Sequence, residues 1–171
     1  MKRKVIKLII LSIALGSILY FSISLRSERV LKLRSQGNKC VCEITSVATK
    51  TFNSRIFFKR KYYYHTSSNP PIGLVPGEEY YCSFDPSNPE DQLVELRKPY
   101  FNPRNRFVTI SPKSLSTFWY EKKDLEFQYS VNGIDYCRIQ NVEDSEAYEK
   151  NKSGLYVKYM TANPAIAYLL Y

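Results

Sequence analysis

An apolar segment near the N-terminus constrains this chain more than any other feature of its 171 residues. Val5–Leu25 reads VIKLIILSIALGSILYFSISL, with Lys7 as its one charged residue. An α-helix needs about 20 apolar residues to cross the hydrocarbon of a bilayer. Lys2, Arg3 and Lys4 precede the segment, and Tyr20 and Phe21 lie near its other end, where interfacial aromatic residues are often found. We therefore predict a single-pass transmembrane anchor at residues 5–25, preceded by a basic N-terminal tail at residues 1–4.

A cleaved signal peptide is the alternative, because Ser22 and Ser24 offer the small residues of a cleavage site. The apolar run is longer than a usual signal core, which favours a retained anchor. Basic residues lie on both sides of the segment, so the charge rule for orientation is nearly balanced. We expect the domain on the exported, periplasmic or extracytoplasmic, face, because the basic tail is short and concentrated and the cysteine number is even.

The formal net charge of +9 is unevenly distributed. Lys2, Arg3, Lys4 and Lys7 lie at the start of the predicted anchor. Residues 45–77 contain basic residues and no acid, and acids dominate residues 124–149. Such unevenness more often reflects internal complementarity and solubility than a nucleic-acid site, for which a basic footprint alone is a weak signal. We predict that the chain does not bind nucleic acid.

Alternating apolar and polar residues follow a polar, basic juxtamembrane linker at residues 26–38, and this period of two is typical of β-strands. Asn132-Gly133 has the signature of a tight type I′ hairpin turn. Aromatic residues make up 15% of the chain, and such residues suit half-buried pleated surfaces. We predict an all-β fold, a small sandwich or barrel, with strands at residues 40–52, 56–65, 79–84, 125–131, 134–140 and 154–160.

The two halves end in similar sequences at a constant offset of 75 residues. Tyr81–Pro89 reads YCSFDPSNP, and Tyr156–Pro164 reads YVKYMTANP. In both, an aromatic strand end is followed by Asn-Pro and then by an apolar stretch. We predict two related β units at residues 39–96 and 124–171, joined by a basic connection at residues 97–123.

Residues 124–171, and more loosely residues 40–96, resemble an uncharacterised family of bacterial membrane-associated proteins. The likeness rests on the hairpin YSVNGIDY, on GLYVKYMTANPAIAYL, and on EEYYCSFDPSNPEDQLVEL, which matches a Tyr-Asp-Pro-x-Asn-Pro tail. Met160-Thr161 departs from the Asp-Pro of that tail. The resemblance implies a membrane-linked β domain of unknown function and carries no specific chemistry.

Catalytic motifs are missing from the sequence. His65 is the one histidine, no acid nearby in the sequence orients it, and neither a P-loop nor a glycine-rich nucleotide turn is present. We expect no catalytic residue, no cofactor and no metal, and we interpret the chain as a non-enzyme.

The four cysteines Cys40, Cys42, Cys82 and Cys137 are candidates for disulfides in an oxidising compartment. Three pairings are open, of which Cys40 with Cys42 is the least comfortable. Burial of free thiols is an equal alternative. A zinc site fits poorly, because such sites usually draw pairs of ligands two to four residues apart.

Four residues of an aromatic and basic stretch are candidates for binding a partner: Phe57, Arg60, Tyr62 and Tyr64. Strand alternation places Tyr63 on the face opposite Tyr62 and Tyr64, so at least one ring faces solvent or a partner. We expect a membrane-anchored, non-catalytic β module that binds another protein, in an envelope accessory or immunity-type role, or that forms a homo-oligomer through its sheet edges.

Two alternatives belong to other classes of protein. A thiol-redox enzyme that uses the cysteines predicts an exposed thiol of low pKa. Binding of an anionic envelope polymer predicts salt-sensitive affinity, carried by Lys59, Arg60, Lys61, Arg104 and Arg106.

Overall fold

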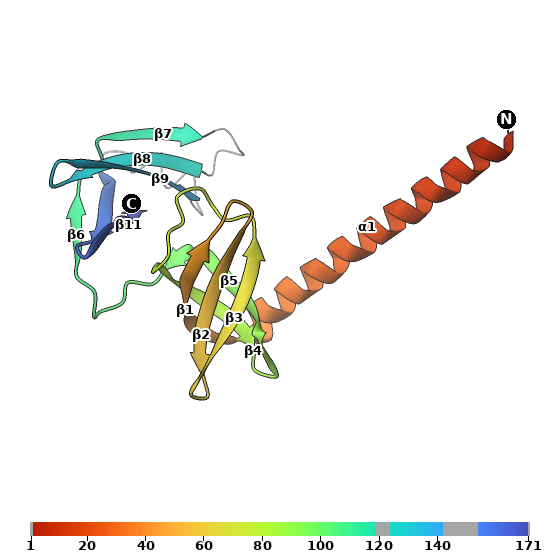
Figure 1. The fold of residues 1–171 in the computed structure, drawn as a ribbon, viewed down its shortest axis with the longest axis horizontal. Coiled ribbons are helices and arrows are strands. Elements are labelled where there is room, and N and C mark those ends of the chain that lie inside the picture. The colour runs from red at the N-terminus through yellow and green to blue at the C-terminus, as the bar shows by residue number, and fades with distance from the viewer. Residues whose placement is uncertain (1, 119–123, 142–153, 171) are drawn as a thin grey trace.

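A long N-terminal helix leads into two groups of antiparallel strands in the computed structural model (Figure 1). The structure describes residues 2–118, 124–141 and 154–170. The helix is α1 (Lys2–Gln36). The first unit consists of β1 (Asn38–Val47), β2 (Thr51–Phe58), β3 (Lys61–Ser68), β4 (Glu79–Asp85) and β5 (Asn88–Pro99). The second unit consists of β6 (Phe107–Ile110), β7 (Ser114–Phe118), β8 (Asp124–Val131), β9 (Ile134–Asn141), β10 (Tyr156–Met160) and β11 (Asn163–Leu170). The predicted all-β class is confirmed for the described residues.

The first unit is one curled sheet with the strand order β3-β2-β1-β4-β5. β1 pairs with β4 through its first half and with β2 through its second half, and a bulge lies between Ile44 and Ser46. The two edge strands, β3 and β5, approach each other across the curl. The amide of Gln92 on β5 bridges them, because its Nε2 donates to the carbonyl of Tyr63 on β3 at 3.2 Å.

The second unit repeats this strand order in two pieces, β6-β10-β11 and β7-β8-β9. Residues 111–113 separate β6 from β7 and include Pro112, whose nitrogen cannot donate to a ladder. β6 and β7 together therefore occupy the position of β1. Gln140 on β9 bonds both the N–H and the C=O of Leu169 on β11, at 2.8 and 3.0 Å. This amide connects β9 to β11, as Gln92 connects the corresponding strands β3 and β5 of the first unit.

The hairpins β4–β5 and β10–β11 share one pairing register at the offset of 75 residues. Cys82 pairs with Val94 as Val157 pairs with Leu169, and the turn pair Asp85 and Asn88 corresponds to Met160 and Asn163. Both hairpins also shift register at the same place, immediately before the turn. The similar sequences at the ends of the two halves therefore form the same local structure.

The two units are joined by β11, which is buried on both faces. Ile166 and Tyr168 complete the core of the first unit. Ala167 and Leu169 belong to the core of the second. Successive residues of a strand point to opposite sides, so four consecutive residues can serve two cores.

The helix docks its last turns on the first unit. Leu33 is buried, and three ion pairs join the helix to the region of β4 and β5: Arg29–Asp91, Lys32–Asp85 and Arg34–Glu95. Residues 26–36, which were expected as a linker, are thus helical and attached to the domain. Within the described part of the chain, no helix combines the length and apolarity needed to cross a membrane.

Two predicted strands have the wrong boundaries. The stretch 40–52 contains the end of β1, a turn at residues 48–50 and the start of β2, and the stretch 56–65 contains the whole β2–β3 turn. Both errors arise because these turns lack the usual glycine, proline or asparagine. The stretch 97–123, expected as a basic connection, includes β6 and β7. Residues 142–153 of the second predicted unit lie outside the described residues.

Candidate functional site

The outer surface of β2 and β3 carries three exposed aromatic side chains. Phe57, Tyr62 and Tyr64 have exposed fractions of 62%, 55% and 55%. Phe57 lies directly opposite Tyr62 in the strand register, and their ring centroids are 5.1 Å apart. Tyr63 points the other way and contacts Phe58 in the partly buried layer. The structure therefore brings three of the four predicted contact residues onto one surface, which we call the aromatic face.

Arg55 holds the aromatic face in place. Its guanidinium lies 4.8 Å from the centroid of the Tyr62 ring and bonds the Glu43 carboxylate at 2.8 and 3.0 Å. Arg55 also pairs with Tyr64 in the strand register. Planar contacts of a guanidinium with an aromatic ring and a carboxylate limit side-chain motion, so the rings are held in position before any partner arrives.

The fourth predicted contact residue, Arg60, lies at the β2–β3 tip, which we define as residues 58–61. Lys59 and Arg60 form its two central positions, with φ of 48° and 65°. The left-handed region costs an ordinary residue roughly 1–2 kcal/mol, and two-residue hairpins prefer Asn-Gly there. The equivalent turn of the second unit contains Asn132-Gly133, with φ of 51° and 80°. The first unit thus places two cations where glycine and asparagine would fit more easily.

A buried ion pair lies between the two units. Glu78 is completely buried, Arg138 is nearly so, and the Arg138 guanidinium contacts the Glu78 carboxylate. The hydroxyl of Tyr80 donates to the other carboxylate oxygen, and Arg138 Nη1 donates to the carbonyl of Ala165 at 2.8 Å. Burial raises the pKa of Glu78, while Arg138 and Tyr80 act in the opposite direction. Each charge therefore depends on the other for compensation.

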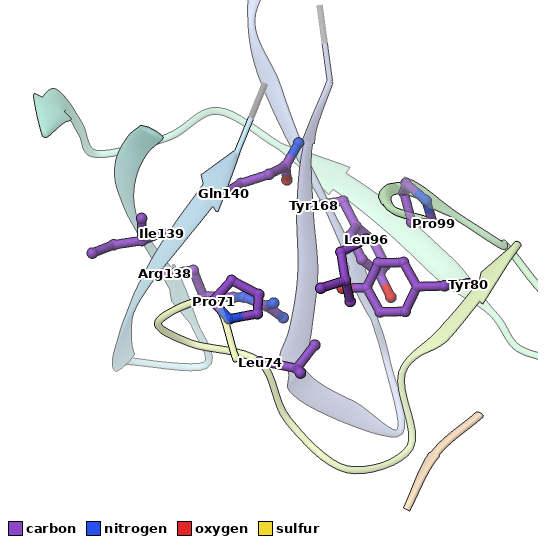
Figure 2. A pocket seen from close by; sticks show the side chains of 9 residues that line it. All are labelled: Pro71, Leu74, Tyr80, Leu96, Pro99, Arg138, Ile139, Gln140 and Tyr168. Carbon is purple, nitrogen blue, oxygen red and sulfur yellow. The ribbon is translucent and has the colours of Figure 1, made fainter. Parts of the chain in front are cut away.

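A small cavity of about 30 Å³ lies beside this ion pair. Figure 2 shows its lining, to which both units contribute: Pro71, Leu74, Tyr80, Leu96, Pro99, Arg138, Ile139, Gln140 and Tyr168. Pockets for organic ligands usually have volumes of about 300–1,000 Å³. This cavity is of the size that holds a water molecule, so it belongs to the junction between the units and is too small for a substrate.

Three of the four cysteines gather in the first unit. Cys40 and Cys82 are register partners on β1 and β4, and Cys42 is buried on the same face of β1 as Cys40. Cys137 is exposed on β9 of the second unit. The four sulfurs therefore do not form one cluster, which removes the geometric basis of a four-thiolate zinc site.

None of the cysteine pKa shifts that the structure resolves is downward. Contact with Cys82 and burial raise the pKa of Cys40. For Cys82, the hydrogen bond from Cys40 favours the thiolate, but contact with Cys42 and burial outweigh it and raise the pKa. Slight burial and the nearby Glu126 raise the pKa of Cys137. A redox nucleophile needs the opposite direction, because the thiolate is the reactive form.

His65 is half-buried between β3 and β5. Its Nδ1 donates to the carbonyl of Glu90 at 2.8 Å, which adds a second side-chain bridge across the curl. Burial lowers the pKa of His65, the Arg29 guanidinium lowers it further, and the Glu90 carbonyl and Asp91 act in the opposite direction. The histidine therefore has a structural role at this seam.

Three features of the structure left no signal in the sequence. Glu78 and Arg138 are far apart in the chain and lie in ordinary polar stretches, so nothing marks them as partners. The bridging amides of Gln92 and Gln140 likewise depend on how each sheet curls. The Cys40–Cys82 pairing was one of several open choices, because it depends on the register between β1 and β4, which the sequence does not give.

Replacing Arg138 with Met is expected to lower the free energy of unfolding by about 3–5 kcal/mol, because it leaves the Glu78 charge buried without its partner. Combining Arg138→Met with Glu78→Gln removes both charges and keeps an oxygen that accepts the Tyr80 hydroxyl, so the double variant should lose less than the single one. Urea unfolding followed by tyrosine fluorescence measures both. An equal or larger loss in the double variant would contradict this account.

Titration of His65 should reduce the stability of the chain as the pH is lowered from 7.5 to 5.5. The folded-state pKa of His65 lies below the unfolded value of about 6.5, so the unfolded chain binds the proton more readily in this window. His65→Asn keeps a donor near Glu90 and removes the titration, so its unfolding free energy should change less over the same range. Urea titrations of both proteins at pH 7.5 and pH 5.5 test this. If the unfolding free energy changed equally with pH in both proteins, the prediction would be refuted.

Comparison with protein-family models, with curated proteins and with solved structures finds no match to this chain. The resemblance to an uncharacterised membrane-associated family therefore stays a prediction. Any functional conclusion rests on the aromatic face, the β2–β3 tip and the way α1 is attached.

Proposed function

We propose that this chain is a membrane-anchored, non-catalytic β module that binds another protein through the aromatic face and the adjoining β2–β3 tip. The observation that carries the proposal is the exposure of Phe57, Tyr62 and Tyr64 side by side on one surface. Aromatic residues and arginine are enriched among the residues that dominate binding energy at protein interfaces. Contiguous apolar surface of this kind more often marks an interaction site than chance exposure.

The strained tip supports the same surface. Lys59 and Arg60 retain left-handed backbone conformations that destabilise the turn, although the second unit shows a favourable alternative at the same place. Cations beside exposed rings favour a partner with acidic groups around an apolar centre, because such a rim complements the charge of the tip. An accessory subunit of an envelope complex and an immunity-type inhibitor are both binding modules of this kind.

Membrane attachment through residues 5–25 is the second part of the proposal. It is supported by the apolar sequence of that segment and by the exposure of Tyr20, Phe21 and Ile23 on a helix that extends away from the strands in Figure 1. The basic residues that follow the segment are engaged with the domain, as the pairs Arg29–Asp91 and Arg34–Glu95 illustrate. We place the domain on the exported face of the membrane.

Duplication of one β unit accounts for the shared strand order. The common register of the β4–β5 and β10–β11 hairpins supports this, as do the matching two-residue turns of β2–β3 and β8–β9. On this proposal the second unit begins at β6. The aromatic face belongs to the first copy alone. In the register of the second copy, the positions of Phe57, Tyr62 and Tyr64 are occupied by non-aromatic residues, namely Ser130, Asp135 and Cys137.

Binding of an anionic polymer is less well supported. Lys59, Arg60 and Lys61 lie at the tip, where Phe58 contacts Phe84 near the end of β4. Residues 100–106 begin near the start of that strand, where the N–H of Tyr100 donates to the carbonyl of Glu79. The length of β4 separates the two groups by about 20 Å. A continuous basic track for a polymer would need these groups to be neighbours.

Site-specific photo-crosslinking in the cells that produce the protein tests the binding surface directly. A photoreactive phenylalanine analogue placed at position 57, 62 or 64 should give one adduct of the same partner mass from all three positions. Analogues at Ile72 and Ile134 are matched controls, because both side chains are exposed and apolar but lie outside the aromatic face. These controls should not give that adduct.

The mass of the adduct separates the outcomes. A product of twice the chain mass would identify a homo-oligomer, and a product with one different protein would identify a heterologous partner. Failure of positions 57, 62 and 64 to give any adduct, or the same adducts from every position, would contradict the proposal.

Exchange of the tip turn should separate stability from binding. Lys59→Asn with Arg60→Gly places residues that adopt positive φ easily at the two left-handed positions. The backbone strain falls, so the free energy of unfolding should rise by about 1–2 kcal/mol. The same variant loses the two cations, so crosslinking from position 62 should weaken. Thermal or urea unfolding and the crosslink yield are measured on the same protein.

The reciprocal exchange is the control. Asn132→Lys with Gly133→Arg introduces the strain into the second unit and should lower stability while leaving the crosslink at position 62 unchanged. If both exchanges changed crosslinking to the same extent, the tip would have no special part in binding.

A further inference from the structure

Cys40 and Cys82 lie directly opposite each other on neighbouring antiparallel strands. They are register partners between Lys39–Ser83 and Val41–Tyr81 in the β1–β4 ladder. Their sulfur atoms are 2.8 Å apart. Directly opposed residues in such a ladder have Cα atoms about 4.5–5.5 Å apart, within the range of about 4.4–6.8 Å that disulfides span. The backbone is therefore already placed for a bond between the two sulfurs.

The other two cysteines fit less well as partners. Cys42 is opposite Tyr80, so it is only a diagonal neighbour of Cys82, and diagonal Cα separations of about 7–8 Å exceed the usual disulfide range. Cys137 is exposed on β9, where it pairs with Gln128 in the second unit. Among the three pairings that the sequence leaves open, the ladder favours the one that joins Cys40 to Cys82.

The second unit shows that this position does not need sulfur for packing. In the equivalent ladder, Ile110 lies opposite Val157, where the first unit has Cys40 opposite Cys82. Val157 is fully buried in the second core. An aliphatic pair fills the same place, so the cysteine pair in the first unit offers a chemistry that burial alone does not require.

We propose that Cys40 and Cys82 form a disulfide that fastens β1 to β4. Cys40, the more exposed of the two, loses its proton, and the thiolate attacks a sulfur of a low-molecular-weight disulfide such as oxidised glutathione. The thiolate that leaves takes up the proton and is released as one thiol. Because the pKa of Cys40 is raised, this step is slow, as suits a structural bond rather than a catalytic one. Cys82 then gives up its proton and displaces the second thiol. Two protein thiols and one external disulfide become one protein disulfide and two external thiols. Cys42 and Cys137 stay reduced.

The bond would act at the point where the helix enters the sheet. Cys40 follows the end of α1 at Gln36 by four residues, and Asn38, the first residue of β1, pairs with Phe84 at the end of β4. The covalent route by which a force on α1 reaches the sheet therefore runs through the first residues of β1, beside the ion pairs that join the helix to β4 and β5. A covalent link at Cys40 passes part of the force from α1 to β4, so β1 stays paired with β4. The bond is independent of which partner the aromatic face binds.

The test uses the purified chain of residues 1–171 equilibrated with oxidised and then with reduced glutathione. After denaturation, maleimide additions are counted by mass spectrometry. Oxidised wild type should take two additions and reduced wild type four. Cys42→Ser and Cys137→Ser should each take one when oxidised and three when reduced, and Cys40→Ser should take three in both states. Peptide mapping of the oxidised wild type should yield one cross-linked peptide pair, which contains Cys40 and Cys82.

A stability measurement provides the matched control. Oxidised wild type should melt at a higher temperature than reduced wild type, because the bond closes a long loop in the unfolded chain. The double variant Cys40→Ile with Cys82→Val carries the residues of the second unit and should show no redox-dependent shift. Three additions to oxidised Cys42→Ser, or a mapped bridge to Cys42 or Cys137, would overturn the proposal. Peptide mapping uses the wild-type protein, so it identifies the bridged cysteines even if a variant fails to fold.

Discussion

The arrangement of the whole domain depends on β11, a strand with apolar side chains on both faces. Ile166 and Tyr168 face the first core, and Ala167 and Leu169 face the second. A strand of a small sheet is usually buried on one face, with the other in water. Because one face of β11 supplies Ile166 and Tyr168 to the first core, that core is incomplete without the second unit. Residues of the last hairpin therefore fix where the two units lie relative to each other.

The Glu78–Arg138 pair adds directional information to this apolar contact. Apolar surfaces can slide past one another, because the hydrophobic effect has no direction. The ion pair permits one arrangement, in which Arg138 reaches Glu78 and the carbonyl of Ala165 together. Gly73 suits the loop that meets β9, because its φ of 86° lies in the left-handed region that favours glycine. Specific polar contacts thus define one register between the units.

Local patterns in the sequence predicted those parts of the fold that depend on neighbouring residues. Alternation indicated an all-β chain, and Asn132-Gly133 located the β8–β9 turn, because those residues suit positive φ. The β2–β3 turn was missed because Lys59-Arg60 carries no such signal, and two strands were read as one. Sequence alternation separated Tyr63 from Tyr62 and Tyr64, as the structure also does. The junction residues could not be predicted, since Glu78, Arg138 and β11 acquire their roles only when two distant segments meet.

The continuous helix α1 has a mechanical consequence. If residues 5–25 lie in a bilayer, residues 26–36 extend about 16 Å beyond it as helix and are joined to β4 and β5 by Leu33 and the ion pairs. A flexible linker of that length would let the domain sweep a hemisphere of comparable radius. A docked helix instead holds the domain at one height and one tilt above the membrane. Partners are then selected by the position of their binding surface relative to the bilayer as well as by the chemistry of that surface.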